Sequence, residues 1–183
     1  NNLVDITNSI MTELGQPMHV FDRDTISGNI SVRMGKSGEK FIALDDKEYT
    51  ITDMDIVIAD DEKILALAGI TEKISSVTDA TKNTLWESAC FDPITVRLSS
   101  QRHGIRTDAS MRYEKSLDPL LANTTFSRVF EYLSFLGNTQ KTKAEFHFTD
   151  VSKVKHITIE VLESFIDSKA GMIIPTDIKE KIL

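Results

Sequence analysis

Several polar side chains stand where they could bind or transform a small polar ligand, although their spacing alone identifies no reaction. The foremost is Glu87, which lies in the middle of a predicted strand between the apolar Leu85 and Ala89 on the same face. A carboxylate there must face solvent at a sheet edge, pair with another group, or line a cavity, because burial without a partner is costly. An edge position or an internal pair is the commoner outcome, and a cavity that uses the carboxylate is the alternative.

Three further features have a conceivable binding role, each with a plainer alternative. His19 follows Gln16-Pro17 and could be catalytic, but a loop histidine is more often a hydrogen-bonded surface group. Asn8 lies at the polar boundary of a predicted helix, where a solvated or capping side chain is the alternative. Residues 104–110 are rich in small hydrogen-bonding side chains, so this loop could present backbone N–H groups to a ligand or simply close turns.

The sequence contains none of the common motifs for phosphate, serine or metal chemistry. It has no phosphate-binding glycine loop, no serine elbow and no histidine pair at metal-binding spacing. A single cysteine, Cys90, excludes an internal disulfide and a cysteine-based zinc site, fits a reducing compartment, and is predicted to be a small buried hydrophobic residue. We therefore expect no metal site, because the histidines are too scattered to form one: His19, His103, His147 and His156.

Composition and charge restrict the function classes. The 183 residues are 40% hydrophobic and 27% charged, which is typical of a globular chain. The net charge of -7 excludes broad electrostatic wrapping of nucleic acid but permits a local phosphate contact. The one local excess of positive charge, from Arg97 to Lys115, is most simply a solvated helix face. No apolar run reaches the length of a membrane span and no leader opens the chain, which begins with Asn1 and is expected to be a piece of a longer protein.

The elements that must position these residues follow from hydrophobic spacing and turn signals. Apolar residues recur at helical spacing from Val4 to Leu14, and Gly15 supplies a left-handed stop. From Asn29 to Ile70 the period changes to two, which predicts short strands with a hairpin corner at Asp45-Asp46. The polar stretch 71–82 predicts a loop, and residues 83–91 predict the strand that carries Glu87.

Two helices follow with clear start signals. Asp92-Pro93 and Asp118-Pro119 each combine an N-cap residue with a proline at the first helical position. Gly104 and Gly137 are predicted to end these two helices.

The C-terminal part begins with a last strand of the main domain, predicted from the alternating Ala144, Phe146 and Phe148. Residues 157–159 are strand-like, residues 161–166 are helical, Ala170-Gly171 breaks that helix, and Pro175-Thr176 opens a final helix. About 30 residues cannot bury a self-sufficient core, so this segment is expected to be the start of a second module.

Five runs of the sequence, in order, resemble one protein family closely. They are Asn2–Asn8, Glu13–Asp22, Leu67–Ile70, Trp86–Pro93 and Arg106–Glu114. Over residues 1–150 the chain is similar to the editing-domain region of the β subunit of bacterial-type phenylalanyl-tRNA synthetases. The tail from Lys155 resembles, more weakly, the opening of the next module of that subunit, which is helical and DNA-binding-like.

The resemblance implies a fold and a domain division. The fold is α+β, with mixed β-sheets layered with helices in a β/β/α-type sandwich, followed by the start of a small helical module. The tRNA-editing domain is expected at residues 1–151, and the truncated start of the DNA-binding-like module at residues 152–183.

The resemblance also implies a function. In that family the domain hydrolyses tyrosine wrongly attached to the phenylalanine tRNA, so this fragment is expected to carry aminoacyl-tRNA ester hydrolysis and not the ligation reaction. By matching positions, His19 and Thr107 become the catalytic residues that position the ester and a water. The substrate-binding residues become Asn8, Gly69, Glu87 and Ala109, where Glu87 reads the tyrosine hydroxyl and the small Ala109 admits the ring. Neither a metal nor a nucleophilic side chain is implied.

The role implied for Glu87 has a physical basis. Tyrosine and phenylalanine differ by one hydroxyl, so a buried carboxylate that needs a donor accepts tyrosine and stays unpaired with phenylalanine. Polar discrimination of this kind can reach about 10⁴. Hydrolysis is expected to proceed by orientation of a water, helped by a ribose hydroxyl of the substrate, without a covalent intermediate.

The resemblance further implies partners and a location. They are the 3′ end of the phenylalanine tRNA and the synthetase α subunit of an intact α2β2 enzyme, in the cytoplasm and without a membrane. No cofactor is expected in this fragment, whereas the intact synthetase uses ATP and Mg²⁺.

One departure from the family pattern favours a different class of function. The family usually follows its Gly-Ile or Gly-Val with a Gly-Gly pair, whereas here Gly69-Ile70 is followed by Thr71-Glu72-Lys73-Ile74. Glycine is used where backbone approaches a ligand closely or takes a positive φ. The alternative is therefore a structural, tRNA-contacting scaffold with a degenerate, inactive editing pocket.

Overall fold

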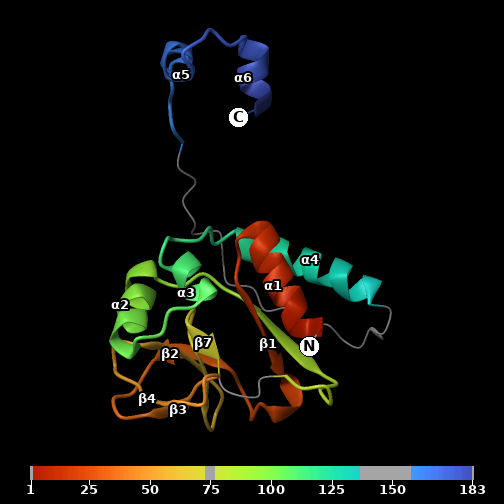
Figure 1. Ribbon diagram of the computed structural model, residues 1–183, viewed down its shortest axis with the longest axis vertical. Coiled ribbons are helices and arrows are strands. Elements are labelled where there is room, and N and C mark those ends of the chain that lie inside the picture. The colour runs from red at the N-terminus through yellow and green to blue at the C-terminus, as the bar shows by residue number, and fades with distance from the viewer. Residues whose placement is uncertain (1, 73–76, 137–157, 183) are drawn as a thin grey trace. The chain divides into compact units, whose positions relative to one another are not determined.

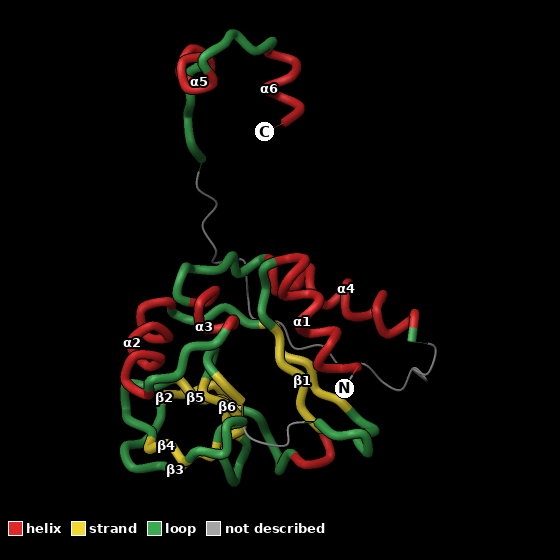
Figure 2. Tube along the Cα trace, in the orientation of Figure 1, coloured by secondary structure: helices red, strands yellow, loops and turns green. Residues whose placement is uncertain are grey.

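The computed structural model describes residues 2–72, 77–136 and 158–182. The chain divides into two compact units, Asn1–Thr149 and Asp150–Leu183, and each is described by itself. The first unit combines helices with three antiparallel sheets, which confirms the predicted α+β class (Figures 1 and 2). The predicted domain boundary between residues 151 and 152 stays a prediction.

A two-stranded ribbon with two helices on it forms one part of the first unit. The ribbon pairs β1 (Met18–Asp22) with β8 (Thr84–Ser88), and α1 (Asn2–Leu14) and α4 (Leu121–Phe135) pack against it (Figure 1). The predicted helix over residues 4–14 is confirmed, and Gly15 ends it in the left-handed conformation at φ 77°. A small apolar cluster lies at this contact: Ile6, Ile10, Met18 and Val129.

The larger core belongs to a second part built on a four-stranded antiparallel sheet. Its strands lie in the order β2 (Ser31–Met34), β5 (Ile56–Ala59), β6 (Ile64–Leu67) and β7 (Thr71–Glu72). The short helices α2 (Pro93–His103) and α3 (Asp108–Tyr113) contribute Val96 and Tyr113 to the same core. A separate hairpin pairs β3 (Lys40–Ile42) with β4 (Glu48–Thr50), and its corner at Asp45-Asp46 is confirmed by the positive φ of Asp46.

The two predicted helix starts have different outcomes. Asp92 caps α2 as predicted, since its side chain accepts a hydrogen bond from the backbone N–H of Thr95 (2.8 Å), and Gly104 ends the helix at φ 65°. The cap predicted at Asp118 is wrong. Asp118 accepts instead from the backbone N–H of Leu120 (2.9 Å), which closes a local turn before α4 begins at Leu121 without a side-chain cap.

Between residues 29 and 91 one local prediction is confirmed and two need correction. The alternation in β2 predicts a strand correctly, but this is an edge strand whose apolar residues are exposed, with Val32 61% and Met34 50% accessible. Thr71 and Glu72 form β7 rather than part of a loop, because they pair with Leu67 and Ala66 of β6. Cys90 is exposed and not buried, since β8 ends at Ser88 and the thiol turns to the backbone oxygen of Leu117.

The second unit is a pair of short helices, α5 (Glu163–Ala170) and α6 (Thr176–Ile182). The break at Gly171 and the helix start at Thr176 are confirmed, whereas α5 begins two residues later than predicted and Thr158 and Ile159 form no strand. Ile157 and the predicted strand at 144–148 lie outside the described residues. Lys179 is 6% exposed, and its ammonium lies between Asp167 (2.8 Å) and Glu163 (3.2 Å).

No helix in the described part of the chain combines the length and the apolar character needed to cross a membrane.

Candidate functional site

Four buried side-chain atoms among the described residues have no hydrogen-bond partner. They are Gln16 Oε1, His19 Nε2, Glu72 Oε2 and Glu87 Oε2. Buried polar atoms are nearly always paired, so each exception needs an explanation. His19 lies directly opposite Glu87 in the β1–β8 ribbon, and the charges of His19 and Glu72 both act on the Glu87 carboxyl. We refer to these four residues as the Glu87 cluster.

The backbone around the Glu87 cluster is held by buried hydrogen bonds. Gln16 is completely buried, and its Nε2 donates to the backbone oxygens of Ala89 (2.8 Å) and Pro17 (3.1 Å). The Tyr113 hydroxyl also donates to the Pro17 oxygen (3.2 Å). These bonds fix the start of β1 against the end of β8, so the side chains of His19 and Glu87 project from a well-supported ribbon.

The electrostatics of the cluster disfavour negative charge on Glu87. Burial raises the pKa of the Glu87 carboxyl. The nearby imidazole of His19 opposes that shift, and the carboxylate of Glu72 adds to it. Burial together with the charge of Glu87 also raises the pKa of Tyr113 well above its ordinary value. A hydrogen-bond donor or a cation placed among these groups would therefore be stabilised.

Gly69 is required by packing at the turn that leads into β7. Its φ is 69°, and a Cβ atom there would lie 3.0 Å from Cδ2 of Tyr113 and 3.1 Å from Cδ2 of Phe91. Both the left-handed conformation and the aromatic rings thus demand glycine. This turn brings the chain back along β6 and so positions Glu72. The predicted role of Gly69 in substrate binding stays a prediction.

Thr107 connects that same turn to α3. Its hydroxyl donates to the backbone oxygen of Ile70 (2.8 Å) and accepts from the backbone N–H of Ser110 (3.1 Å), and Ser110 in return accepts from the Thr107 N–H (2.9 Å). This reciprocal arrangement is a capping box. Thr107 and Ser110 are therefore organised by helix capping, which neither of the two alternatives open from the sequence had named. Ala109 lies in the first turn of α3, half-buried against the larger core.

The six predicted site residues do not all converge. His19 and Glu87 face each other across the ribbon, and Gly69 and Thr107 meet at the turn before Glu72. Asn8 lies exposed on α1, and no hydrogen bond or ion pair of the described residues links its side chain to the Glu87 cluster. Two hollows on the surface, one beside β3 and one beside α2, are lined by none of these residues.

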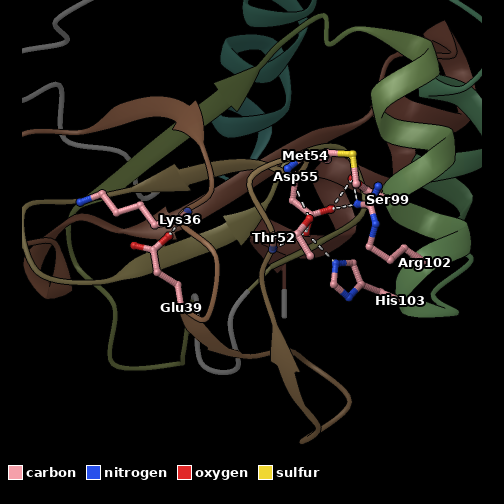
Figure 3. A network of polar contacts seen from close by, with 8 residues as sticks. All are labelled: Lys36, Glu39, Thr52, Met54, Asp55, Ser99, Arg102 and His103. Carbon is pink, nitrogen blue, oxygen red and sulfur yellow. Dashed lines mark hydrogen bonds and ion pairs between the residues drawn. The ribbon is translucent and has the colours of Figure 1, made fainter.

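A second buried carboxylate, Asp55, has the opposite surroundings (Figure 3). It is 0% exposed and accepts hydrogen bonds from the Ser99 hydroxyl (2.6 Å) and from both the N–H (2.8 Å) and the hydroxyl (2.9 Å) of Thr52. His103 Nε2 lies 3.0 Å away, and Arg102 forms an ion pair with it. Burial opposes its ionisation, yet the hydrogen bonds from Ser99, His103 and Thr52 hold the pKa of Asp55 at about 2. The network joins α2 to the turn before β5.

Sequence reasoning missed several of these residues. Glu72 appeared only as a departure from a glycine-rich pattern, and Gln16 only as the neighbour of a proline. Nothing in a single sequence distinguishes them from surface polar residues, because their burial results from contacts between segments far apart in the chain. The Asp55 network did leave a signal, since Ser99, Arg102 and His103 share one face of a helix by their spacing.

Comparisons with known proteins agree with the resemblance seen in the sequence. A family model described as the B3/4 domain matches residues 1–138. The phenylalanine–tRNA ligase β subunit of Latilactobacillus sakei is 42% identical over 146 residues, which cover 78% of this chain and 18% of that protein. The β subunit of Yersinia pestis is 37% identical over 182 residues, 99% of this chain and 23% of that protein. That of Protochlamydia amoebophila is 48% identical over 121 residues, 65% of this chain and 15% of that protein.

The predicted resemblance to phenylalanyl-tRNA synthetase β subunits is thereby confirmed. The chain spans only between 15% and 23% of the length of these three relatives.

Proposed function

From the premise that the chain belongs to the B3/4 domain family, we propose that it hydrolyses tyrosine from mischarged Tyr-tRNA(Phe) as part of a phenylalanine–tRNA ligase β subunit. The observation that carries this proposal is the buried Oε2 of Glu87, which has no hydrogen-bond partner. A carboxylate in that state gains most from a ligand that brings a hydroxyl donor.

Tyrosine, and not phenylalanine, supplies that donor. The charge of Glu87 acts on Tyr113, but the single hydroxyl proton of Tyr113 is already given to the Pro17 oxygen. A tyrosyl group bound beside Glu87 would pair the carboxylate, whereas a phenylalanyl group would leave it unpaired at a cost of about 1–3 kcal/mol. Glu87 would therefore select the mischarged product.

Hydrolysis of the ester requires a water molecule and side chains that orient it toward the ester carbonyl. The oxygen of a water attacks the ester carbonyl, the bond from that carbonyl to the ribose oxygen breaks, and tyrosine and free tRNA are released. His19 has an unpartnered Nε2 and stands opposite Glu87, so it would orient the ester or the water. Thr107 would contribute by holding the turn at Ile70, because its hydroxyl already donates there.

The proposal includes the partners and the location expected from the family. The substrate would be the aminoacylated 3′ end of the phenylalanine tRNA, and the chain would work beside an α subunit in an α2β2 ligase in the cytoplasm. The hydrolysis would need no cofactor in this chain, whereas ATP and Mg²⁺ would serve ligation elsewhere in the ligase.

The test is deacylation of Tyr-tRNA(Phe) by the complete ligase that carries this chain. The wild-type enzyme is expected to exceed the uncatalysed rate, and Glu87→Ala to lose about tenfold to a hundredfold of that rate. Glu48→Ala is the matched control, since Glu48 is an exposed residue of the β3–β4 hairpin paired with Lys40.

The second candidate is a tRNA-contacting scaffold without deacylation. The absence of the family's glycine pair after Gly69-Ile70 favours it. It predicts that the wild-type ligase and Glu87→Ala both deacylate at the uncatalysed rate, a result that would contradict the editing proposal.

A further inference from the structure

We propose that Glu72 is a second recognition residue of this site, namely the carboxylate that binds the α-ammonium group of the aminoacyl substrate. The inference rests on the proposed function and deepens it, because it assigns a binding partner to the other end of the amino acid.

The position of Glu72 is set by backbone pairing. It lies on β7 opposite Ala66 of β6, and its backbone oxygen accepts a hydrogen bond from the N–H of Leu44 (3.1 Å). The carboxylate Oε2 is nevertheless buried without a partner, as is that of Glu87. The main chain therefore fixes the position of Glu72, while its carboxylate Oε2 makes no hydrogen bond.

The two carboxylates also lack a counter-charge. Within the described residues, neither Glu72 nor Glu87 forms an ion pair with a lysine or an arginine, although most buried carboxylates do. Among the residues that the structure describes, His19 is the basic group whose charge acts on Glu87. A pair of carboxyl groups with buried, unpartnered oxygens and so little compensation is complementary to a cationic ligand.

The unpartnered atoms are mostly acceptors. Gln16 Oε1, Glu72 Oε2 and Glu87 Oε2 can only accept hydrogen bonds when the carboxyl groups are ionised, and Gln16 is completely buried. The described residues offer no group of three side chains suited to a metal ion, so an organic donor fits better. A tyrosyl ester brings three donors on its ammonium and one on its phenol, at opposite ends of the molecule.

The two carboxylates would then have different tasks. The ammonium is common to every aminoacyl ester, so Glu72 would contribute affinity without selectivity. The phenol is specific to tyrosine, so Glu87 would contribute selectivity. The two residues can therefore be told apart by which ligand group each one recognises, and not only by how much a substitution weakens binding.

The experiment measures binding to the 183-residue chain by calorimetry, with tyrosinamide and N-acetyl-tyrosinamide as probes. The acetyl group removes the positive charge and leaves the phenol intact. Wild-type protein is expected to bind tyrosinamide about tenfold more tightly than its acetylated form, and Glu72→Gln to bind the two alike. Glu72→Asp keeps the charge and should retain part of the preference, which separates charge recognition from a folding defect. Glu48→Gln, at the exposed hairpin residue that pairs with Lys40, is the matched control and should keep the preference.

An unchanged preference in Glu72→Gln, or the absence of a preference in the wild-type chain, would overturn the proposal. The same comparison with phenylalaninamide and its acetylated form separates this proposal from the proposed function. An ammonium preference that depends on Glu72 with both amino acids supports the role of Glu72, whether or not Glu87 distinguishes tyrosine from phenylalanine.

Discussion

Asp55 and Glu87 both carry buried carboxylate oxygens in the first unit, yet their surroundings shift their pKa values in opposite directions. Asp55 receives hydrogen bonds from Ser99 and Thr52 and lies against Arg102 and His103, and its pKa falls to about 2. Glu87 keeps an unpartnered oxygen, and burial raises its pKa. A fully paired buried charge serves the fold, whereas an unpaired one needs an explanation, which the proposed function supplies as a ligand that brings the missing donor.

The largest effect is expected from Asp55→Ala. It removes the buried acceptor of the Ser99 and Thr52 hydrogen bonds and the counter-charge of Arg102, and breaking such a buried network costs about 3–5 kcal/mol of unfolding free energy. Urea denaturation of the chain measures the loss. The control is Asp53→Ala, which removes the same side chain at an exposed position two residues away. Equal midpoints for the two variants would refute the structural role of Asp55.

Glu87→Gln is expected to give the contrary pattern. Removal of an unpaired buried charge should leave the unfolding free energy unchanged or increase it, because no partner loses a bond. The deacylation rate should fall about tenfold to a hundredfold, since the phenol loses its charged acceptor. The same urea titration and the rate assay test both parts. A loss of stability similar to that of Asp55→Ala would show that the two carboxylates are equivalent after all.

The stability contributions of the two carboxylates should change in opposite directions with pH. The pKa of Asp55 is about 2 in the folded chain and 3.8 ordinarily, so its contribution of about 2 kcal/mol is present above pH ~4 and is lost as the pH falls towards 2. The folded pKa of Glu87 lies above its ordinary 4.5, so its contribution is present below that pH and is lost as the pH rises through the folded pKa.

Urea titrations across this range test both signs. Asp55→Asn should flatten the acid side of the profile, and Glu87→Gln should remove part of the decline at higher pH. If both substitutions changed the pH profile of stability in the same way, the proposed difference between Asp55 and Glu87 would be contradicted.

The smallest effect concerns Thr107, whose hydroxyl joins α3 to the turn before Glu72. Thr107→Val removes the cap to Ser110 and the bond to the Ile70 oxygen, and should cost about 1–2 kcal/mol of unfolding free energy. Thr107→Ser keeps the hydroxyl and should stay close to the wild type. If Thr107→Val lost deacylation without losing stability, the hydroxyl would have a direct part in catalysis.

The sequence predicted what local physics determines. Helical spacing and Gly15 correctly predicted α1, the Asp92-Pro93 signal predicted the start of α2, and Gly171 predicted the end of α5. Predictions failed where an alternative local bond was equally available, as at Asp118, which closes a turn instead of capping a helix.

The candidate site was only partly predictable for a different reason. Glu87 stood out because a carboxylate interrupts an apolar strand face, and the resemblance supplied His19 as its neighbour. Glu72 and Gln16 gave no signal, since Gln16 bonds to the backbone of Ala89, 73 residues later, and Glu72 acts on Glu87 from a strand of another sheet. Asp55 was missed because its partners on α2 follow more than 40 residues later in the chain.

The most direct test of the central claim is the ratio of deacylation rates for Tyr-tRNA(Phe) and Phe-tRNA(Phe) in the complete ligase. If the unpaired oxygen of Glu87 reads the phenol, the wild-type enzyme hydrolyses the tyrosyl ester much faster, and Glu87→Gln brings the two rates close together. A wild-type preference that survives unchanged in Glu87→Gln would contradict the account.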